Sequence, residues 1–266
     1  MSSAKRRTAT LLAAAVSLFA AATAQARTDG SRPISIGVYS AITSVPAATL
    51  DAVGADNVAG PAQFGVARFS GKRLMKNGKP QFIAASLAWC PHCAANSWAI
   101  TVALLRFGTF AKLRTIDTGT FFAKQGGKPP FSHTKGLSFL NSGYESEYLT
   151  FTPIIAEDLK GETFQTPTKA QARALKFSKN GFPATNIGGL YGTVGSGYGP
   201  EYLRGAKLTH QQIANAIHKP STAIAKRIGG LANFFSAAIC ELTGGQPADV
   251  CTSPGVQAGK AKLPTG

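Results

Sequence analysis

Acidic residues are scarce in this chain. Of its 266 residues, 12 are Asp or Glu and 28 are Lys or Arg, which gives a formal net charge of +16 at pH 7. No Asp or Glu occurs between Asp56 and Asp117. The basic residues are nevertheless scattered, and the Lys/Arg run of about five to eight residues that often marks nucleic-acid binding is absent. The composition therefore predicts a solvated basic surface, with weak attraction to anionic envelope surfaces at most, and no nucleic-acid partner.

Long apolar segments are absent after the N-terminus. Residues 8–22 (TATLLAAAVSLFAAA) form an apolar run that follows three basic residues and precedes Ala24-Gln25-Ala26. This order is typical of a secretory signal. The run is shorter than the ~20 residues that a membrane-spanning helix needs. We therefore expect residues 1–26 to be a cleaved signal, and the remaining chain, with a net charge of +13, to be periplasmic or extracellular without stable membrane insertion.

Cysteine is also sparse, with Cys90 and Cys93 close together and Cys240 and Cys251 further apart. Disulfides persist in exported proteins, and four cysteines allow three connectivities. We expect the neighbouring pairs 90–93 and 240–251. The wide spacing of the second pair does not match a zinc ribbon. A 240–251 disulfide would close a short loop and contribute ~2–3 kcal/mol to stability; a second redox pair is the alternative.

The first cysteine pair falls where the sequence pattern changes from strand to helix. Residues 81–88 (QFIAASLA) are short and apolar, which is typical of a buried strand. Residues 90–107 then have apolar side chains at helical spacing and several alanines. Gly108 ends this segment, and we expect residues 113–116 to form the next strand. The pair is thus predicted at the strand-to-helix junction of a βαβ unit.

The rest of the chain also alternates strand and helix patterns, which predicts an α/β fold. Further strands are expected at 64–69, 148–155, 184–187 and 190–194, and further helices just before Gly54 and at 168–179, 208–218 and 221–242. Residues 27–61 are expected to be a lead-in with one short helix, and residues 62–251 the main domain. Residues 252–266 are expected to be a flexible tail.

The sequence Cys90-Pro91-His92-Cys93 has the spacing of a redox-active pair. Residues i and i+3 of a helix lie on one face with Cβ atoms ~5–6 Å apart, close to disulfide range. Cys90 would lie at the helix N-terminus, where unpaired N–H groups and the macrodipole stabilise a thiolate. Protonated His92 would add to this effect. Cys93, one turn further along, would be the resolving thiol.

Only cations flank this motif in the sequence. A lowered thiol pKa stabilises the reduced pair and makes its disulfide a stronger oxidant, so we expect an oxidant rather than a reductant. Two other readings of the motif stay open. Cys90, His92 and Cys93 could bind Cu(I) or zinc in a metal-binding or metallochaperone module. Alternatively, the pair could be a structural disulfide in a redox-inert binding module.

Several motifs of this chain resemble those of thioredoxins. Trp89 and the Cys-x-x-Cys motif after a buried strand match the thioredoxin pattern, and the inner dipeptide Pro91-His92 is like that of the periplasmic oxidant DsbA. The segment Gly181-Phe182-Pro183 before a strand hairpin is similar to the cis-proline segment of that fold. The resemblance implies that Pro183 faces Cys90 and helps to hold extended substrate backbone.

A closer resemblance is to the thioredoxin-like family called domain of unknown function 929. The matching motifs are Asn77-Gly78-Lys79-Pro80, Cys90-Pro91-His92-Cys93-Ala94-Ala95, Arg106-Phe107-Gly108-Thr109-Phe110, Tyr148-Leu149-Thr150-Phe151-Thr152-Pro153, Ile187-Gly188-Gly189 and Gln246-Pro247-Ala248-Asp249-Val250-Cys251. It implies a thioredoxin-like fold with an enlarged insertion, about residues 118–180, between the βαβ unit and the cis-proline hairpin. This chain departs from the family at Asn96-Ser97. It also has alanine and leucine where the family has an acidic residue, in the strand before Cys90.

Together these features predict an exported thiol–disulfide oxidoreductase. Cys90, Cys93, His92, Pro91 and Pro183 are its expected catalytic residues, and Cys240–Cys251 its structural disulfide. The expected substrates are thiols of extracytoplasmic proteins, which attack the Cys90–Cys93 disulfide. Reoxidation would need a membrane redox partner, and no dissociable cofactor is expected.

Overall fold

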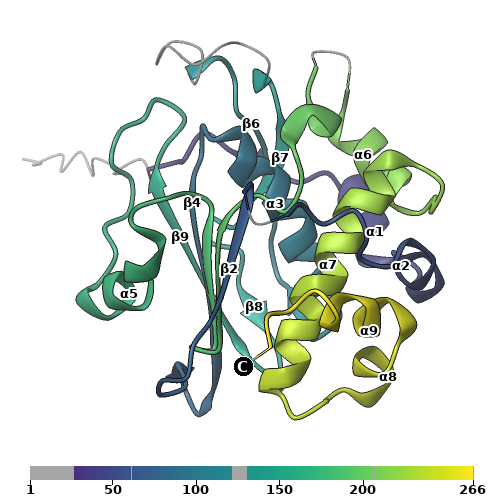
Figure 1. The fold of residues 1–266 in the computed structure, drawn as a ribbon. Coiled ribbons are helices and arrows are strands. Elements are labelled where there is room, and N and C mark those ends of the chain that lie inside the picture. Colours follow the sequence, from purple (N-terminus) through teal and green to yellow (C-terminus); the bar gives the residue numbers. More distant parts are fainter. Residues whose placement is uncertain (1–26, 61, 122–130, 206–207, 266) are drawn as a thin grey trace, which may run out of the picture.

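A six-stranded mixed sheet runs through the centre of the molecule (Figure 1). The computed structural model describes residues 27–60, 62–121, 131–205 and 208–265, so the expected signal at 1–26 lies outside the described residues. The strands are β2 (Phe64–Arg68), β3 (Met75–Lys76), β4 (Lys79–Leu87), β9 (Thr150–Glu157), β10 (Ala184–Ile187) and β11 (Tyr191–Gly195). Their order is β2-β11-β10-β4-β3, and β9 also pairs with β4. The β4–β9 pair is parallel and the others are antiparallel. The expected α/β class is confirmed.

Strand β4 and helix α3 (Pro91–Leu104) form the centre of the core. From Gln81 to Leu87, every β4 residue except Ser86 is buried, as in a strand covered on both faces. Every α3 residue except His92 is buried as well. Cys90 is the N-cap and Pro91 the first helical residue, where a missing N–H has no cost. Helix α3 therefore begins at the cysteine pair.

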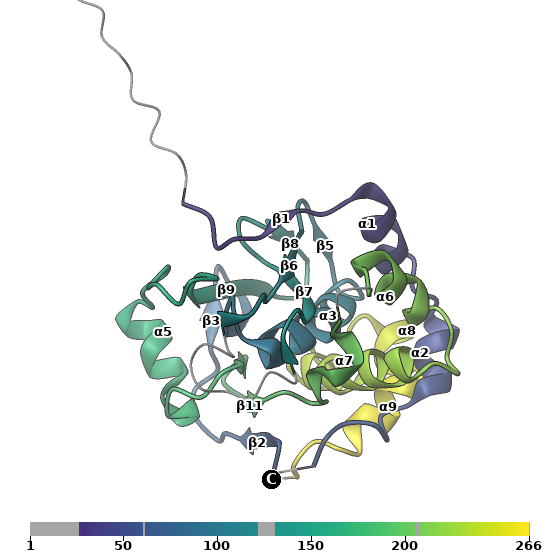
Figure 2. The same cartoon turned by 90° about the horizontal axis from the view of Figure 1, so that it is seen from above.

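Helices cover the two faces of the sheet unequally (Figures 1 and 2). Helix α7 (Ala223–Leu242) packs beside α3. Around them lie α1 (Ile36–Thr43), α2 (Ala47–Val53), α6 (His210–Ile217), α8 (Ala248–Cys251) and α9 (Pro254–Lys260). On the opposite side lies α5 (Lys169–Ala174), followed by a 3-10 turn at Lys176–Ser178. No single helix among the described residues has the length and apolar composition of a membrane span, although the bent pair α1–α2 together passes that test.

The strand expected near residues 113–116 is present, but it does not belong to the βαβ unit. We expected residues 113–116 to be the second strand of the βαβ unit, but β6 (Arg114–Asp117) lies in a separate antiparallel sheet between β1 (Arg32–Pro33) and β7 (Lys135–Ser138). The parallel partner of β4 is β9 instead. The sequence of β9 is longer and more apolar than that of β6, and therefore suits the buried position better.

The segment expected as an insertion, about 118–180, contains part of this β-α-β unit. Strand β9 lies within it, and residues 105–149 connect α3 to β9. They contain β6, β7 and the two-stranded sheet of β5 (Thr109–Phe110) and β8 (Tyr144–Glu145).

The expectations for both chain ends are also corrected. Residues 27–61 are more than a lead-in, since Val38, Ile42 and Leu50 belong to the main hydrophobic core. The segment 252–266 is not a flexible tail, because it contains α9, and Val256 and Leu263 are buried in the same core.

Two glycines allow the C-terminal helix α9 to pack closely against α7. A Cβ at Gly255 would come within 2.6 Å of the Asn233 side chain, and one at Gly259 within 2.4 Å of the Asn233 carbonyl oxygen. These glycines permit close approach of α9 to α7, whereas in the sequence they suggest flexibility.

Candidate active site at Cys90 and Cys93

The two cysteines lie in the turn between β4 and α3. The backbone N–H of Cys93 donates to Cys90 Sγ at 3.3 Å, so the Cys90 side chain caps α3. The backbone N–H of Leu87, the last residue of β4, donates to Cys93 Sγ at 3.4 Å. Both side chains are buried, and neither sulfur is part of a disulfide.

The environment shifts the two thiol pKa values in opposite directions. Hydrogen bonding to the Cys93 side chain, and then to the backbone N–H groups of Cys93 and His92, lowers the pKa of Cys90 although burial opposes this. Burial, followed by the hydrogen bond and charge of Cys90, raises the pKa of Cys93 well above its ordinary value. Cys90 is therefore the thiol of the pair that ionises more readily, and Cys93 the one that keeps its proton longer.

His92 is held beside the pair by a serine distant in sequence. Its Nδ1 lies 2.7 Å from Ser196 Oγ, and its ring contacts the Phe131 ring at 5.7 Å. Burial lowers the His92 pKa, although the charge of Glu201 acts against this. The imidazole is therefore mainly neutral at pH 7, and the N–H groups at the start of α3 stabilise the Cys90 thiolate more than a charged His92 does.

The loop that carries Ser196 is tied to α3. Asn96 Nδ2 donates to the Gly195 carbonyl at 3.2 Å, and Asn96 Oδ1 accepts from the Gly197 N–H at 3.2 Å. Tyr198 donates its hydroxyl to the Ala95 carbonyl. Asn96, noted in the sequence only as a departure from the resembled family, thus fixes the loop that positions His92.

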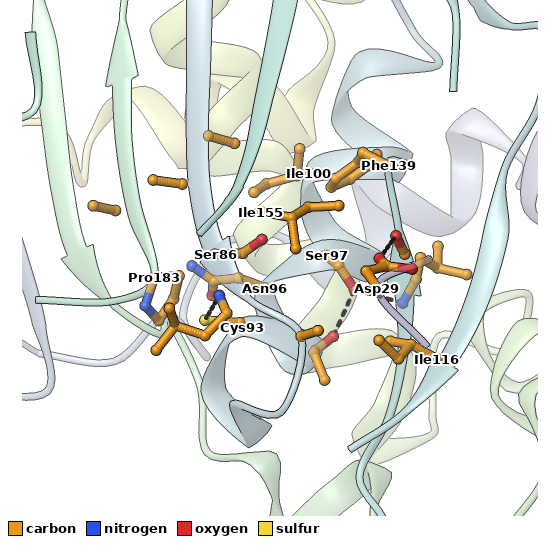
Figure 3. A pocket seen from close by; sticks show the side chains of 18 of the residues that line it. Asp29, Ser86, Cys93, Asn96, Ser97, Ile100, Ile116, Phe139, Ile155 and Pro183 are labelled. Carbon is orange, nitrogen blue, oxygen red and sulfur yellow. Dashed lines mark hydrogen bonds between the residues drawn. The ribbon is translucent and has the colours of Figure 1, made fainter. Parts of the chain in front are cut away.

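Pro183 is brought next to the pair by the tertiary structure. The Phe182–Pro183 peptide bond is cis. Phe182 packs against the cluster formed by Leu87, Cys90 and Cys93. Pro183 and Cys93 line the same cavity (Figure 3).

That cavity lies behind Cys93 and has a volume of about 30 Å³. Its polar lining includes Ser86, Asn96, Ser97 and Asp29 (Figure 3). A polar cavity holds a water molecule when it offers roughly 10–15 Å³, so this one has room for water. Water there would connect the buried Cys93 thiol to polar groups deeper in the protein.

Asp29 is a residue that sequence reasoning missed. It is 1% exposed, and its carboxylate accepts hydrogen bonds from the N–H and hydroxyl of Ser31 and the hydroxyl of Ser138. Asp29 forms no ion pair with a basic side chain of the described residues. The strand before Cys90 has no carboxylate, but the N-terminal segment supplies one to the cavity of Cys93. The scarcity of acidic residues was the signal available in the sequence, but it does not show which of them is near the pair.

The rim of the site is aromatic. Trp89 Nε1 donates to Glu157 Oε2 at 2.7 Å, and the Trp89 ring contacts Phe121 at 5.3 Å. Phe131 contacts the His92 ring, and Trp89 and Phe182 pack against the cysteine pair.

The structure does not bring the motif together as a metal site. In the described part of the chain, no three His, Cys, Asp or Glu side chains are grouped so that they could hold an ion. The other described histidines have separate partners: His133 pairs with Asp117, His210 contacts the Ile116 and Gly136 carbonyls, and His218 contacts the Ala41 carbonyl.

The second cysteine pair is a disulfide. Cys240, near the end of α7, is bonded to Cys251 of α8, with a Cα–Cα distance of 5.6 Å. Its position links α8 and the following α9 to α7.

Comparison with known proteins identifies a family but no activity. The model of the family described as domain of unknown function (DUF929) matches residues 66–176. The chain is similar to this family over that range. The resemblance inferred from the motifs is thus confirmed over this range, which includes Cys90 and Cys93 but ends before Pro183. No curated protein and no solved structure matches the chain.

Proposed function

We propose that this protein is an exported thiol–disulfide oxidoreductase that forms disulfides in extracytoplasmic proteins. The main support is that the two thiol pKa values are shifted in opposite directions. The pKa of Cys90 is lowered at a helix N-terminus, and that of Cys93 is raised by burial. This is the arrangement that a nucleophilic thiolate and a resolving thiol need.

We also propose that the fold is thioredoxin-like. The strand order β9-β4-β10-β11 has a parallel β4–β9 pair joined through α3, and an antiparallel β10–β11 hairpin on the other side of β4. The cysteine pair begins α3, and the cis proline precedes β10. The segment at 105–149 would be the addition that distinguishes this chain.

The reaction would begin with the oxidised pair. A substrate thiolate attacks Cys90 Sγ, the Cys90–Cys93 bond breaks, and its electron pair leaves on Cys93, which takes up a proton. A second substrate thiolate then attacks the substrate sulfur of the mixed disulfide and releases the Cys90 thiolate. The substrate loses two electrons and the pair gains them. A membrane redox partner would accept these electrons, and no dissociable cofactor takes part.

Asp29 would serve the proton transfer at Cys93. Because burial raises the pKa of Cys93, its thiol must give up a proton to a base when the pair is reoxidised. The Asp29 carboxylate lines the same cavity and is the base that water there could reach.

A redox titration of residues 27–266 in glutathione buffers, with thiol trapping, tests the proposal. We expect one pair to titrate reversibly at a potential closer to about −120 mV than to about −270 mV, as a strong oxidant does. The variant Cys90→Ser should remove this transition, while the Cys240–Cys251 disulfide stays closed. If neither pair opens until the protein unfolds, Cys90–Cys93 is structural and the proposal fails. Stoichiometric copper or zinc in the purified protein would instead favour a metal-binding module.

A further inference from the structure

Two acid-free stretches of the chain contribute a group of unpaired cations to the surface. Besides residues 57–116, residues 163–200 contain no Asp or Glu. Apart from Arg68, which pairs with Glu241, the exposed basic residues from the β2–β4 region and from α5 and its following turn are Lys72, Arg73, Lys76, Lys169, Arg173, Lys176 and Lys179. None of the seven forms an ion pair with a described carboxylate. We call these seven residues the basic face.

The two groups of cations lie on neighbouring segments. The Phe69 ring, before the first group, contacts the Phe177 ring, inside the second, at a centroid distance of 5.1 Å. Leu74 and Phe177 pack on the same small cluster of the sheet, which includes Ile83 and Ala85. This cluster is on the side of the sheet that carries α5, away from α7 (Figure 2).

An exposed apolar side chain lies among the first group. Met75 is 51% exposed, and the other large apolar side chain exposed in the described residues is Ile36. Met75 belongs to the β3–β4 hairpin, whose turn residues Asn77 and Gly78 have φ of 52° and 76°. The hairpin therefore presents a methionine next to Lys76 at a tight, projecting turn.

The charges in this hairpin are not balanced by the protein itself. Lys76 and Lys79 are cross-strand partners, and like charges placed opposite each other are destabilising. Their ammonium groups lie against neutral acceptors, Lys76 against Thr152 Oγ1 at 3.5 Å and Lys79 against the Ser146 carbonyl at 2.6 Å. Glu145 and Glu147 flank Ser146, so Lys79 is not counted in the basic face.

We infer that the basic face docks this protein on an anionic lipid bilayer, with Met75 inserted between the headgroups. Each Lys or Arg near such a surface contributes about 1 kcal/mol of attraction. An apolar side chain surrounded by cations is typical of interfacial binding. A polyanion such as a nucleic acid would use the cations but has no need of Met75. An anionic lipid surface is therefore the partner that fits both the cations and the exposed Met75.

This orientation has a consequence for the cysteine pair. Strand β4 begins beside the hairpin at Lys79 and ends at Leu87, just before Cys90. At about 3.3 Å per residue this strand spans roughly 26 Å. The hairpin end of the basic face is therefore remote from Cys90, whereas Lys179 lies three residues before Phe182, which packs against the cysteine pair. The docking does not depend on the proposed redox activity.

Vesicle co-sedimentation of residues 27–266 tests the inference. Vesicles of phosphatidylcholine with ~30% phosphatidylglycerol should bind the protein at low salt, and pure phosphatidylcholine vesicles should not. The triple variant Lys72→Gln, Arg73→Gln, Lys76→Gln should bind roughly 100-fold more weakly, from about 1 kcal/mol per charge. A second triple variant, Lys169→Gln, Arg173→Gln, Lys176→Gln, should lose affinity to a similar extent. Met75→Ser should weaken the binding that persists at high salt.

A matched variant separates a docking face from net charge. Lys219→Gln, Lys226→Gln, Lys260→Gln removes the same charge from exposed positions at α6, α7 and α9, on the other side of the sheet. We expect it to change vesicle affinity by less than about 3-fold. Equal losses in this variant and the first triple variant would overturn the inference. Absence of binding to the anionic vesicles, or binding to a short DNA duplex in place of vesicles, would also overturn it.

Discussion

Cys90 and Cys93 differ in reactivity because of their immediate neighbours. Cys90 Sγ accepts the Cys93 N–H at the first turn of α3, where N–H groups have no partner within the helix. Cys93 is enclosed between β4, α3 and Pro183. Three residues of separation along the helix are therefore enough to place one thiol where a thiolate is stabilised and the other in a buried position.

The stability of the reduced protein should depend on pH in two directions. Hydrogen bonding lowers the pKa of Cys90 in the folded protein. The contribution of Cys90 to the free energy of unfolding is therefore absent below its pKa in the folded state and complete above its pKa in the unfolded state. Burial raises the pKa of Cys93 in the folded protein. The contribution of Cys93 to the free energy of unfolding is therefore lost as pH rises through its pKa in the folded state. We expect stability first to rise with pH between the lowered Cys90 pKa and the ordinary thiol pKa, and then to fall.

Urea unfolding of the reduced protein across this pH range measures the effect, and thiolate absorbance gives the pKa directly. Cys90→Ser is the control and should remove the rising limb. His92→Ala should leave the Cys90 pKa below its ordinary value, because the backbone N–H groups remain. A return to the ordinary value in His92→Ala would show that the imidazole, not the helix start, controls the thiolate.

Asp29→Asn should slow reoxidation of the Cys90–Cys93 pair. The amide keeps the shape of the side chain but cannot take a proton from Cys93, and general-base assistance is typically worth 10²–10⁴-fold. We expect a loss of about 10²-fold at pH 7 that becomes smaller as pH rises, measured by stopped-flow reaction with a small disulfide. Asp56→Asn, at an exposed carboxylate 92% accessible in its side chain, is the matched control. An unchanged rate and pH profile in folded Asp29→Asn would rule out this role.

At the scale of helices and strands, the packing of two helices depends on how closely their backbones can approach, which the sequence pattern alone does not show. Helix α9 is short and has two glycines, yet it packs along α7 because Gly255 and Gly259 face Asn233. Asn233 in turn donates to the Leu50 and Gly54 carbonyls at the end of α2. The N-terminal and C-terminal helices are thus joined through one buried side chain of α7.

Gly259→Ala should therefore destabilise the protein despite the higher helix propensity of alanine. A Cβ there would lie 2.4 Å from the Asn233 carbonyl oxygen, and insertion of a methyl group into a packed contact typically costs about 1–3 kcal/mol. Urea unfolding should show a loss in this range. Gly71→Ala is the matched control, since no atom lies within 4 Å of its added Cβ. Equal stability of the two variants would show that α9 is not held tightly against α7.

Considered as a whole, the molecule closes its core with both ends of the described chain. Val38 and Ile42 near one end and Val256 and Leu263 near the other belong to the cluster that contains Trp98 and Phe235. The same N-terminal segment carries Asp29 to the cavity behind Cys93. Both the core and the candidate site therefore depend on residues outside the central sheet.

Removal of residues 253–266 should lower the free energy of unfolding of the whole molecule. The truncation exposes the surface covered by Val256 and Leu263, and each such side chain contributes about 1.5–3 kcal/mol when buried. We expect a cooperative transition at lower urea concentration, with Cys240–Cys251 still formed. Substitution of exposed Lys260 and Lys262 by Gln, without truncation, should have little effect. A truncated protein as stable as the full chain would contradict the observed packing of α9.

The sequence correctly predicted the structural features that depend on residues only a few positions apart. Cys90 and Pro91 indicate a helix start, the alanines after them favour α3, and Gly188-Gly189 predicts the β10–β11 hairpin. Positive net charge and the acid-free stretch around the motif are likewise visible in the chain itself. These features follow from capping, propensity and turn chemistry, which act locally.

Only the tertiary structure decided which distant segments meet. It paired β4 with β9 and not with β6, and β9 buries Thr152, Ile154 and Ile155 whereas β6 buries Ile116 alone. It placed Asp29 in the cavity of Cys93 and Ser196 beside His92, and it turned the glycines of α9 from a sign of flexibility into a packing contact. Each of these outcomes joins segments far apart in sequence, where spacing and propensity carry no information. Residue types near Cys90 therefore determined the chemistry available to the pair, and long-range packing determined which groups surround it.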